Sequence, residues 1–229
     1  MVFAVGVLGF ELNSIERMTQ SADVAYVNLS EGVESFECPH YDECQNTDKE
    51  CVKAEKFHEE QCAHHAHCHA HGERNPHLWT SPRMLRQMAT TAYEHISRVW
   101  SDSVKYQANY NALMTRLDSL EVSVERRLSE APSRAFVIYH PTFGYLAAEH
   151  GLIEIAVETH GKEPSADHLR RVVDAARKLG AQKVFYQREF PRSVVEAVAG
   201  ELGVEPIEVD ILSGDVEAMI YGFADKLAQ

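Results

Sequence analysis

Asn75-Pro76-His77-Leu78-Trp79-Thr80-Ser81-Pro82 is the stretch around which the rest of the chain is organised. An acidic, cysteine-bearing segment with little apolar content precedes it, and clear helical and strand periodicity follows it. Ser81 is a natural helix N-cap and Pro82 a natural first helical residue, so a helix is expected to begin here. His77 follows a proline and directly precedes that helix, which predicts that its backbone is held in place.

Histidines are concentrated just upstream: seven of the thirteen lie between His58 and His77. Neutral imidazole is the commonest protein ligand of transition metals, and His-rich tracts usually bind metal. An expression tag is the alternative, but tags lie at termini and lack interspersed Cys, Glu and Arg. Because no single helix face could present these histidines together, we expect them to bind several ions weakly. The low-affinity ligands predicted are His58, His64, His65, His67, His69 and His71.

Composition indicates a globular protein with an acidic surface. The 229 residues are enough for one large domain or two small ones, and 45% of them are apolar. The formal net charge is −13, of which residues 31–60 contribute −7 through ten Asp or Glu and three Lys. Such a surface repels phosphate backbones, so no nucleic-acid partner is expected and a cationic ligand suits the chain better. The simpler interpretation of an acidic run is a solvated loop.

All five cysteines (Cys38, Cys44, Cys51, Cys62 and Cys68) fall inside this acidic segment. No Cys-x-x-Cys occurs, so a structural zinc ribbon or a thioredoxin-type motif is poorly supported. In an oxidising compartment they would form two disulfides with one thiol left over, whereas in a reducing one they would be soft metal ligands. Both interpretations stay open. No stretch has the apolar length of a transmembrane helix, and residues 1–10 lack the basic flank of a signal peptide.

Periodicity predicts regular elements on both sides of the acidic segment. Before it come a buried strand at 2–8, a helix at 11–21 and a strand at 24–29, while 31–74 has neither period. After Ser81 a helix is expected whose buried face comprises Leu85, Met88, Ala89, Ala92, Ile96 and Val99. A second helix at 102–130 has no internal Gly or Pro and would be roughly 40 Å long. We interpret it as a rigid spine between two lobes, with a coiled-coil strand as the alternative.

The remainder alternates between strands and helices, with strands at 135–139, 153–157, 183–186 and 206–209. This pattern predicts a parallel sheet covered by helices, in which ligands bind beyond the carboxyl ends of the strands. His140 and Asp210 directly follow two of these strands; Glu158, His160, Gln187, Arg188 and Glu189 follow the other two. The imidazoles of His77 and His140 with one carboxylate would suit Zn²⁺, and acceptably Mn²⁺ or Fe²⁺. The helical His95, His150 and His168 are interpreted as ordinary surface or packing residues.

Several motifs together resemble those of one protein family. The stretch at 75–82 resembles the Asp-Pro-His-x-Trp-x-Ser-Pro motif of metal-binding solute-binding proteins of ABC transporters, particularly the zinc-uptake branch. Tyr139-His-Pro-Thr-Phe-Gly-Tyr-Leu-Ala-Ala-Glu-His-Gly-Leu152 is similar to that family's second-lobe ligand motif. Gly161-Lys-Glu-Pro-Ser165, Val184-Phe-Tyr-Gln-Arg-Glu-Phe190 and Gly6-Val-Leu-Gly-Phe-Glu11 match further segments.

The resemblance implies an α/β fold of two lobes joined by a long rigid backbone helix, with the metal held in the interlobe cleft. The expected division is a partial N-terminal lobe at 1–101 with the Cys/His-rich loop at 31–74, the helix at 102–130 and a C-terminal lobe at 131–229. His77 and His140 carry over as imidazole ligands on facing lobes, with ring nitrogens about 3–4 Å apart given Zn–N bonds of ~2.0–2.1 Å. The resemblance implies Asp210 as a ligand less firmly, because Val209-Asp-Ile-Leu-Ser-Gly214 departs from the family's Asp-Pro-Leu motif.

Members of this family begin with a signal peptide and with strands that supply another first-lobe histidine. We therefore expect this chain to be N-terminally truncated, or its start to be misassigned, with an incomplete first lobe. The expected function is non-enzymatic: a monomeric periplasmic or cell-surface protein binds Zn²⁺ and delivers it to an ABC permease. A cytoplasmic metallochaperone and a zinc-dependent hydrolase remain as alternatives, the latter disfavoured because the sequence contains no His-Glu-x-x-His.

Overall fold

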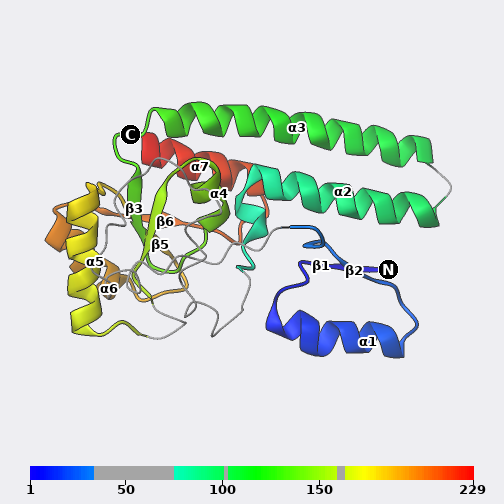
Figure 1. Ribbon diagram of the computed structural model, residues 1–229, viewed down its shortest axis with the longest axis horizontal. Helices are drawn as coiled ribbons and strands as arrows, with labels where there is room; N and C mark the ends of the chain where they lie inside the picture. Colours follow the sequence, from blue (N-terminus) through cyan, green and yellow to red (C-terminus); the bar gives the residue numbers. More distant parts are fainter. Residues whose placement is uncertain (34–74, 101–102, 159–162) are drawn as a thin grey trace, which may run out of the picture.

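The computed structural model describes residues 1–33, 75–100, 103–158 and 163–229 (Figure 1). In these ranges the chain forms two parallel sheets, one of two strands and one of four, with helices packed on them. The predicted α/β class is therefore confirmed. The predictions made for the cysteines and for the histidines from His58 to His71 fall outside the described ranges.

The larger sheet lies in the C-terminal half and has the strand order β4-β3-β5-β6, with every pair parallel. Its strands are β3 (Ala135–Ile138), β4 (Ile153–Ala156), β5 (Val184–Gln187) and β6 (Pro206–Val209). The helices that connect or follow them are α4 (Gly144–Glu149), α5 (Ala166–Leu179), α6 (Arg192–Leu202) and α7 (Val216–Ala228). All four strands lie where the periodicity predicts them, with ends that differ by at most one residue.

Side chains alternate across this sheet and so build two separate cores. Phe136 and Ile138 of β3 face α7 and the long helix α3 (Ser103–Ser129), together with buried Phe223 and Leu128. The intervening Val137 points to the other face, which α5 and α6 cover. Figure 1 shows α5 and α6 on one side of the sheet and α7 and α3 on the other. Because both faces are covered, the strands are mostly apolar, as is typical of parallel sheets. The exceptions are Glu154, Gln187 and Glu208.

Helix α2 (Pro82–Val99) packs antiparallel beside α3. Ser81 caps α2, since its Oγ accepts a hydrogen bond from the Met84 N–H at 3.2 Å. The predicted buried face of α2 is only partly correct, because its apolar residues are half-buried and Val99 is 59% exposed. The C-terminal end of α2 lies beyond the four-stranded sheet (Figure 1), and among the described residues Val99 belongs to neither core of that sheet.

The smaller sheet pairs β1 (Val2–Ala4) with β2 (Tyr26–Asn28), connected through a π-helical turn (Glu11–Ile15) and α1 (Glu16–Ser21). The first strand is shorter than the predicted 2–8. Its end is determined by the buried carboxylate of Glu11, which accepts hydrogen bonds from the backbone N–H groups of Val5, Gly6 and Leu8. Backbone that curls around a carboxylate in this way cannot continue as a strand.

In the part of the chain that the structure describes, every helix is too short or too polar to cross a membrane. The segment that carries His77 precedes α2 in a short 3-10 helix, η5 (Leu78–Thr80), and lies against the loop after β3 that carries His140. The fold therefore brings together the two segments that the sequence singled out.

Candidate metal centre

His77 lies at the start of η5 and is 8% exposed. The Asn75 side-chain oxygen accepts from the backbone N–H of His77 at 3.0 Å and from its ring Nδ1 at 2.8 Å. Since a backbone N–H can only donate, the Asn75 atom facing it is the amide oxygen, and Nδ1 must carry the ring proton. His77 is thereby held as the tautomer whose lone pair is on Nε2.

His140 lies two residues beyond the end of β3, and its ring is oriented in the same way. Its Nδ1 lies 2.7 Å from Oε1 of Glu158, a carboxylate that is 6% exposed. A carboxylate only accepts, so Nδ1 donates, and the lone pair of the neutral ring is again on Nε2. The buried amide of Gln187 fixes the backbone, donating to the His140 carbonyl at 2.8 Å and accepting from its N–H at 3.3 Å.

The two imidazoles touch. Their ring centroids are 5.1 Å apart, with planes at 78°. The Trp79 ring packs edge-on against His77 at 5.3 Å, and Phe190 stacks on His140 at 5.4 Å. Burial, followed by the proximity of His140, lowers the pKa of His77 to about 3. His77 therefore stays neutral over the physiological range, which is the form that binds metal.

Hydrogen bonds hold the His77 segment and the His140 loop in register. The Thr80 hydroxyl lies 2.6 Å from the Thr142 carbonyl and 2.8 Å from the His77 carbonyl. Glu154 on β4 accepts from the backbone N–H groups of Thr142 and Phe143, and burial raises its pKa to about 7. Hydrogen bonds between side chains and the main chain thus fix the two segments that carry the histidine pair.

Asp210, the third predicted ligand, directly follows β6. Its carboxylate accepts from the Leu212 N–H at 3.2 Å and lies 3.6 Å from the Arg188 guanidinium. Within the described residues no group of three or more His, Cys, Asp and Glu is arranged to hold a metal ion. The structure therefore brings His77 and His140 together, while Asp210 stays a prediction.

Four residues that orient the pair were not assigned that role from the sequence: Asn75, Glu154, Glu158 and Gln187. The signals were weak but present. Asn75 stands two residues before a histidine, a spacing at which its side chain can accept from the backbone. Glu158 and Gln187 lie at strand ends beside His140. That Glu158 meets the ring Nδ1 and Gln187 the His140 backbone depends on tertiary contact alone. His168 is a buried packing residue, with Nε2 2.9 Å from the Val157 carbonyl.

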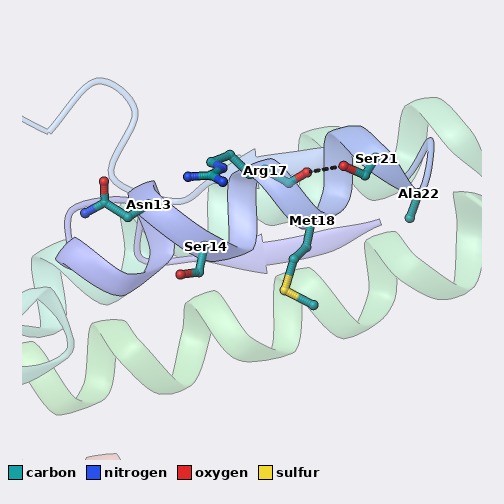
Figure 2. A pocket seen from close by; sticks show the side chains of 6 residues that line it. All are labelled: Asn13, Ser14, Arg17, Met18, Ser21 and Ala22. Atoms are coloured by element: carbon teal, nitrogen blue, oxygen red, sulfur yellow. Dashed lines mark hydrogen bonds between the residues drawn. The ribbon is translucent and has the colours of Figure 1, made fainter.

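A separate hollow of about 620 Å³ lies along α1 (Figure 2). The described residues that line it all belong to that one helical stretch: Asn13, Ser14, Arg17, Met18, Ser21 and Ala22. None is a His, Cys, Asp or Glu, and the hydrogen bond drawn there is the local one from the Ser21 hydroxyl to the Arg17 carbonyl. This hollow has no part in the histidine pair.

Two proteins named for zinc binding or zinc uptake are similar in sequence to part of this chain. "Zinc-binding protein AdcA" of Streptococcus pyogenes serotype M1 is 27% identical over 146 residues, which are 62% of this chain and 28% of AdcA. "High-affinity zinc uptake system protein ZnuA" of Bacillus subtilis (strain 168) is 25% identical over 143 residues, 61% of this chain and 45% of that protein. The chain thus matches less than half the length of either relative.

Solved structures match over a larger part. A crystal structure of ZnuA has a TM-score of 0.78 at 24% identity, covering 99% of this chain and 77% of the other. A ZnuA deletion mutant with zinc bound has a TM-score of 0.78 at 25% identity, with coverages of 99% and 76%. The protein FpvC of Pseudomonas aeruginosa, in complex with Mn²⁺, has a TM-score of 0.70 at 23% identity, with coverages of 99% and 77%.

The family model described as "Zinc-uptake complex component A periplasmic" (ZnuA) matches residues 1–225. This match confirms the resemblance inferred from the motifs at 75–82 and 139–152. It also confirms that the chain belongs among binding proteins and not among enzymes. With almost its whole length matched, the protein belongs to the ZnuA family of solute-binding proteins.

Proposed function

We propose that this chain binds Zn²⁺ through Nε2 of His77 and Nε2 of His140 and delivers it to the membrane permease of an ABC transporter. The observation that carries the proposal is the contact between the two rings, each held at Nδ1 so that its Nε2 lone pair is available. Imidazole is a common ligand of Zn²⁺, so two imidazoles in contact, each held through Nδ1, suit a zinc site.

The nature of the donors favours zinc. Imidazole suits Zn²⁺, whereas Mn²⁺ prefers carboxylate, carbonyl and water oxygens. Mn²⁺ is kept as the second candidate because FpvC, which shares the fold, was solved with that ion. Asp210 or water would complete the coordination, since Zn²⁺ takes four ligands and the pair supplies two. Zinc is here the cargo, so its release matters as much as its binding.

The proposed cellular setting follows the relatives. The family description places its members in the periplasm, and AdcA of Streptococcus pneumoniae (strain ATCC BAA-255 / R6) is a "zinc-binding lipoprotein". We place this protein outside the cytoplasm as a monomer, with an ABC permease as partner. We also propose that residues 1–101 and 131–229 form two lobes connected by the helix at 102–130, with the metal between them.

A chelator-competition titration with Zn²⁺ and Mn²⁺ tests the binding step. Wild type should hold one tight equivalent of Zn²⁺, and His77→Ala and His140→Ala should each weaken it at least about 100-fold, because each removes a direct ligand. His95→Ala is the matched control, since His95 lies in the C-terminal half of α2. Tight binding that survives both site variants would disprove the proposal. A tighter equivalent of Mn²⁺ than of Zn²⁺ would correct the cargo.

A further inference from the structure

We infer that Glu158 and Asn75 are positioning residues that set the metal affinity of the two histidines unequally: Glu158 with a full negative charge, Asn75 without one. This inference rests on the proposed function, because it assigns roles around His77 and His140. Neither residue needs to touch the ion. Each acts through the ring nitrogen that faces away from it.

Glu158 has the geometry of a carboxylate that supports a metal-bound imidazole. Its Oε1 lies 2.7 Å from Nδ1 of His140, and its side chain is 7% exposed. Its backbone is fixed too, since the Glu158 N–H donates to the Tyr139 carbonyl at 2.9 Å. A buried carboxylate hydrogen-bonded to an imidazole increases the basicity of the other ring nitrogen and stabilises positive charge on a bound ion.

Asn75 does the same orienting work with a neutral group. Its side-chain oxygen accepts from both the backbone N–H and Nδ1 of His77, and its own carbonyl accepts from the Tyr145 hydroxyl at 2.8 Å. The residue is 6% exposed, so the amide is well fixed. It fixes the tautomer of His77, as Glu158 fixes that of His140, but adds no charge to attract the cation.

Because Glu158 is charged and Asn75 is not, exchanging acid and amide at the two positions should change Zn²⁺ affinity in opposite directions. Glu158→Gln keeps a hydrogen-bond acceptor but removes the charge, so it should weaken Zn²⁺ binding about 10- to 100-fold. Asn75→Asp adds a carboxylate behind His77, so it should strengthen binding about tenfold by the same mechanism. A purely structural role for either residue predicts loss or no change, never a gain. For a cargo protein, a neutral group behind one ligand leaves the ion easier to release.

The first test needs no metal. Nitrogen-15 NMR of the imidazoles in the metal-free protein should show the Nδ1–H tautomer for both His77 and His140. Glu158→Gln should preserve that pattern, because the amide oxygen still accepts. Glu158→Ala should mix the tautomers of His140 and leave His77 unchanged. An Nε2–H tautomer at either ring in wild type would overturn the inference.

The second test measures Zn²⁺ affinity in the same variants by chelator competition. Glu196→Gln on α6 is the matched control, since it removes one negative charge at an exposed position. Unchanged affinity in Glu158→Gln, while His140→Ala loses binding, would overturn the positioning role and leave the proposed function standing. Tight binding that survives His77→Ala and His140→Ala would overturn the proposed function itself. Folding of Asn75→Asp is checked from its NMR spectrum, and if it does not fold, Glu158→Gln decides the inference.

Discussion

Gly6 occupies a position in the N-terminal segment that does not accommodate a side chain. Its φ is +84°, and a Cβ built there would lie 1.8 Å from Oδ1 of Asn28. That oxygen is engaged already, because it accepts from the backbone N–H and hydroxyl of Ser30. A side chain at this position would be strained by the positive φ. It would also displace the Asn28 side chain and break its contacts with Ser30.

Gly6→Ala is therefore expected to destabilise the protein by at least about 1–3 kcal/mol. Urea unfolding followed by circular dichroism measures the change. Gly9→Ala is the matched control, because a Cβ at Gly9 meets nothing within 4 Å. Gly9 is in a helical turn, so alanine there should be neutral or slightly stabilising. Equal stability of the two variants would show that the contact with Asn28 is not restrictive.

At the scale of single residues, the sequence predicted the positions of the two proposed ligands better than those of the residues that orient them. His77 and His140 were predictable because each stands at an element boundary within a distinctive motif. The roles of Asn75 and Glu158 were not, since each depends on which nitrogen of a ring it meets. That is a matter of angstroms in the folded chain and leaves no pattern in composition or periodicity.

Among the elements, the start of α2 is the best defined from both sequence and structure. The Ser81 hydroxyl accepts from the Met84 N–H and lies within 2.8 Å of both carboxylate oxygens of Glu149, on α4. Ser81→Ala should cost about 1–2 kcal/mol, because it removes the cap and deprives the Glu149 carboxylate of a donor. Thermal unfolding measures it, and Ser81→Thr, which keeps the hydroxyl, should recover most of the loss. Failure of threonine to do so would argue against capping as the cause.

Glu149 also makes stability depend on pH. Burial raises its pKa to about 7 from the 4.5 of an unfolded carboxyl, outweighing the Ser81 hydrogen bond that acts in the opposite direction. Because the folded state holds the proton more tightly, this contribution to stability is full below pH 4.5. It falls as pH rises and is lost above about pH 7.

Glu149→Gln removes this dependence, so the variant should gain about 1–3 kcal/mol on wild type between pH 4.5 and pH 8. The difference between the two proteins is the quantity to measure. Wild type alone is ambiguous, because the lowered pKa of His77 contributes a pH dependence of opposite sign. Urea unfolding at several pH values gives the difference. A difference in unfolding free energy between Glu149→Gln and wild type that does not change with pH would contradict the raised pKa of Glu149.

Most element boundaries were predictable because caps and periodicity are local. Ser165 caps α5, and Gly180 ends it in the left-handed conformation, as their positions suggested. The first strand was not, because Glu11 ends it from six residues further along. The exposure of Val99 was missed for a related reason: helical periodicity shows which residues share a face but not whether anything lies against it.

For the whole molecule, the decisive contacts connect the segment before α2 to the C-terminal sheet. The Trp79 indole N–H donates to the Ile211 carbonyl at 2.9 Å, and the Thr80 hydroxyl reaches the Thr142 carbonyl. These contacts join residues far apart in sequence and keep His77 beside His140. The division of the chain into alternating strands and helices was predictable, whereas this connection was not, since its carbonyl partners have no sequence signature.

Thr80→Val should therefore weaken Zn²⁺ binding several-fold and destabilise the fold by about 1–3 kcal/mol. The valine leaves the buried Thr142 carbonyl without its donor and loosens the fixed approach of the two rings. Thr115→Val is the control, because its hydroxyl donates only to the Asn111 carbonyl of its own exposed helix turn. Chelator competition and urea unfolding measure the two effects. An unchanged affinity would show that the pair is positioned without this hydrogen bond.

The whole chain should hold more than one zinc ion. The histidines from His58 to His71, among so many carboxylates, are expected to bind several ions weakly, whereas the His77/His140 pair binds one tightly. Deleting residues 38–71 should leave one tight equivalent and remove the weaker ones, as measured by calorimetric titration. Loss of the tight equivalent would make the deleted segment the primary site.

Salt separates the two classes further. Long-range attraction of Zn²⁺ by carboxylates is screened over a Debye length of ~10 Å at 0.1 M salt, whereas direct coordination by the His77/His140 pair is screened much less. Weak-site occupancy should therefore fall steeply between low and high ionic strength, and tight-site occupancy should change little. Because the deletion also removes negative charge, the comparison is made on the intact chain. Parallel losses at both classes would mean that one kind of site, not two, accounts for all the bound zinc.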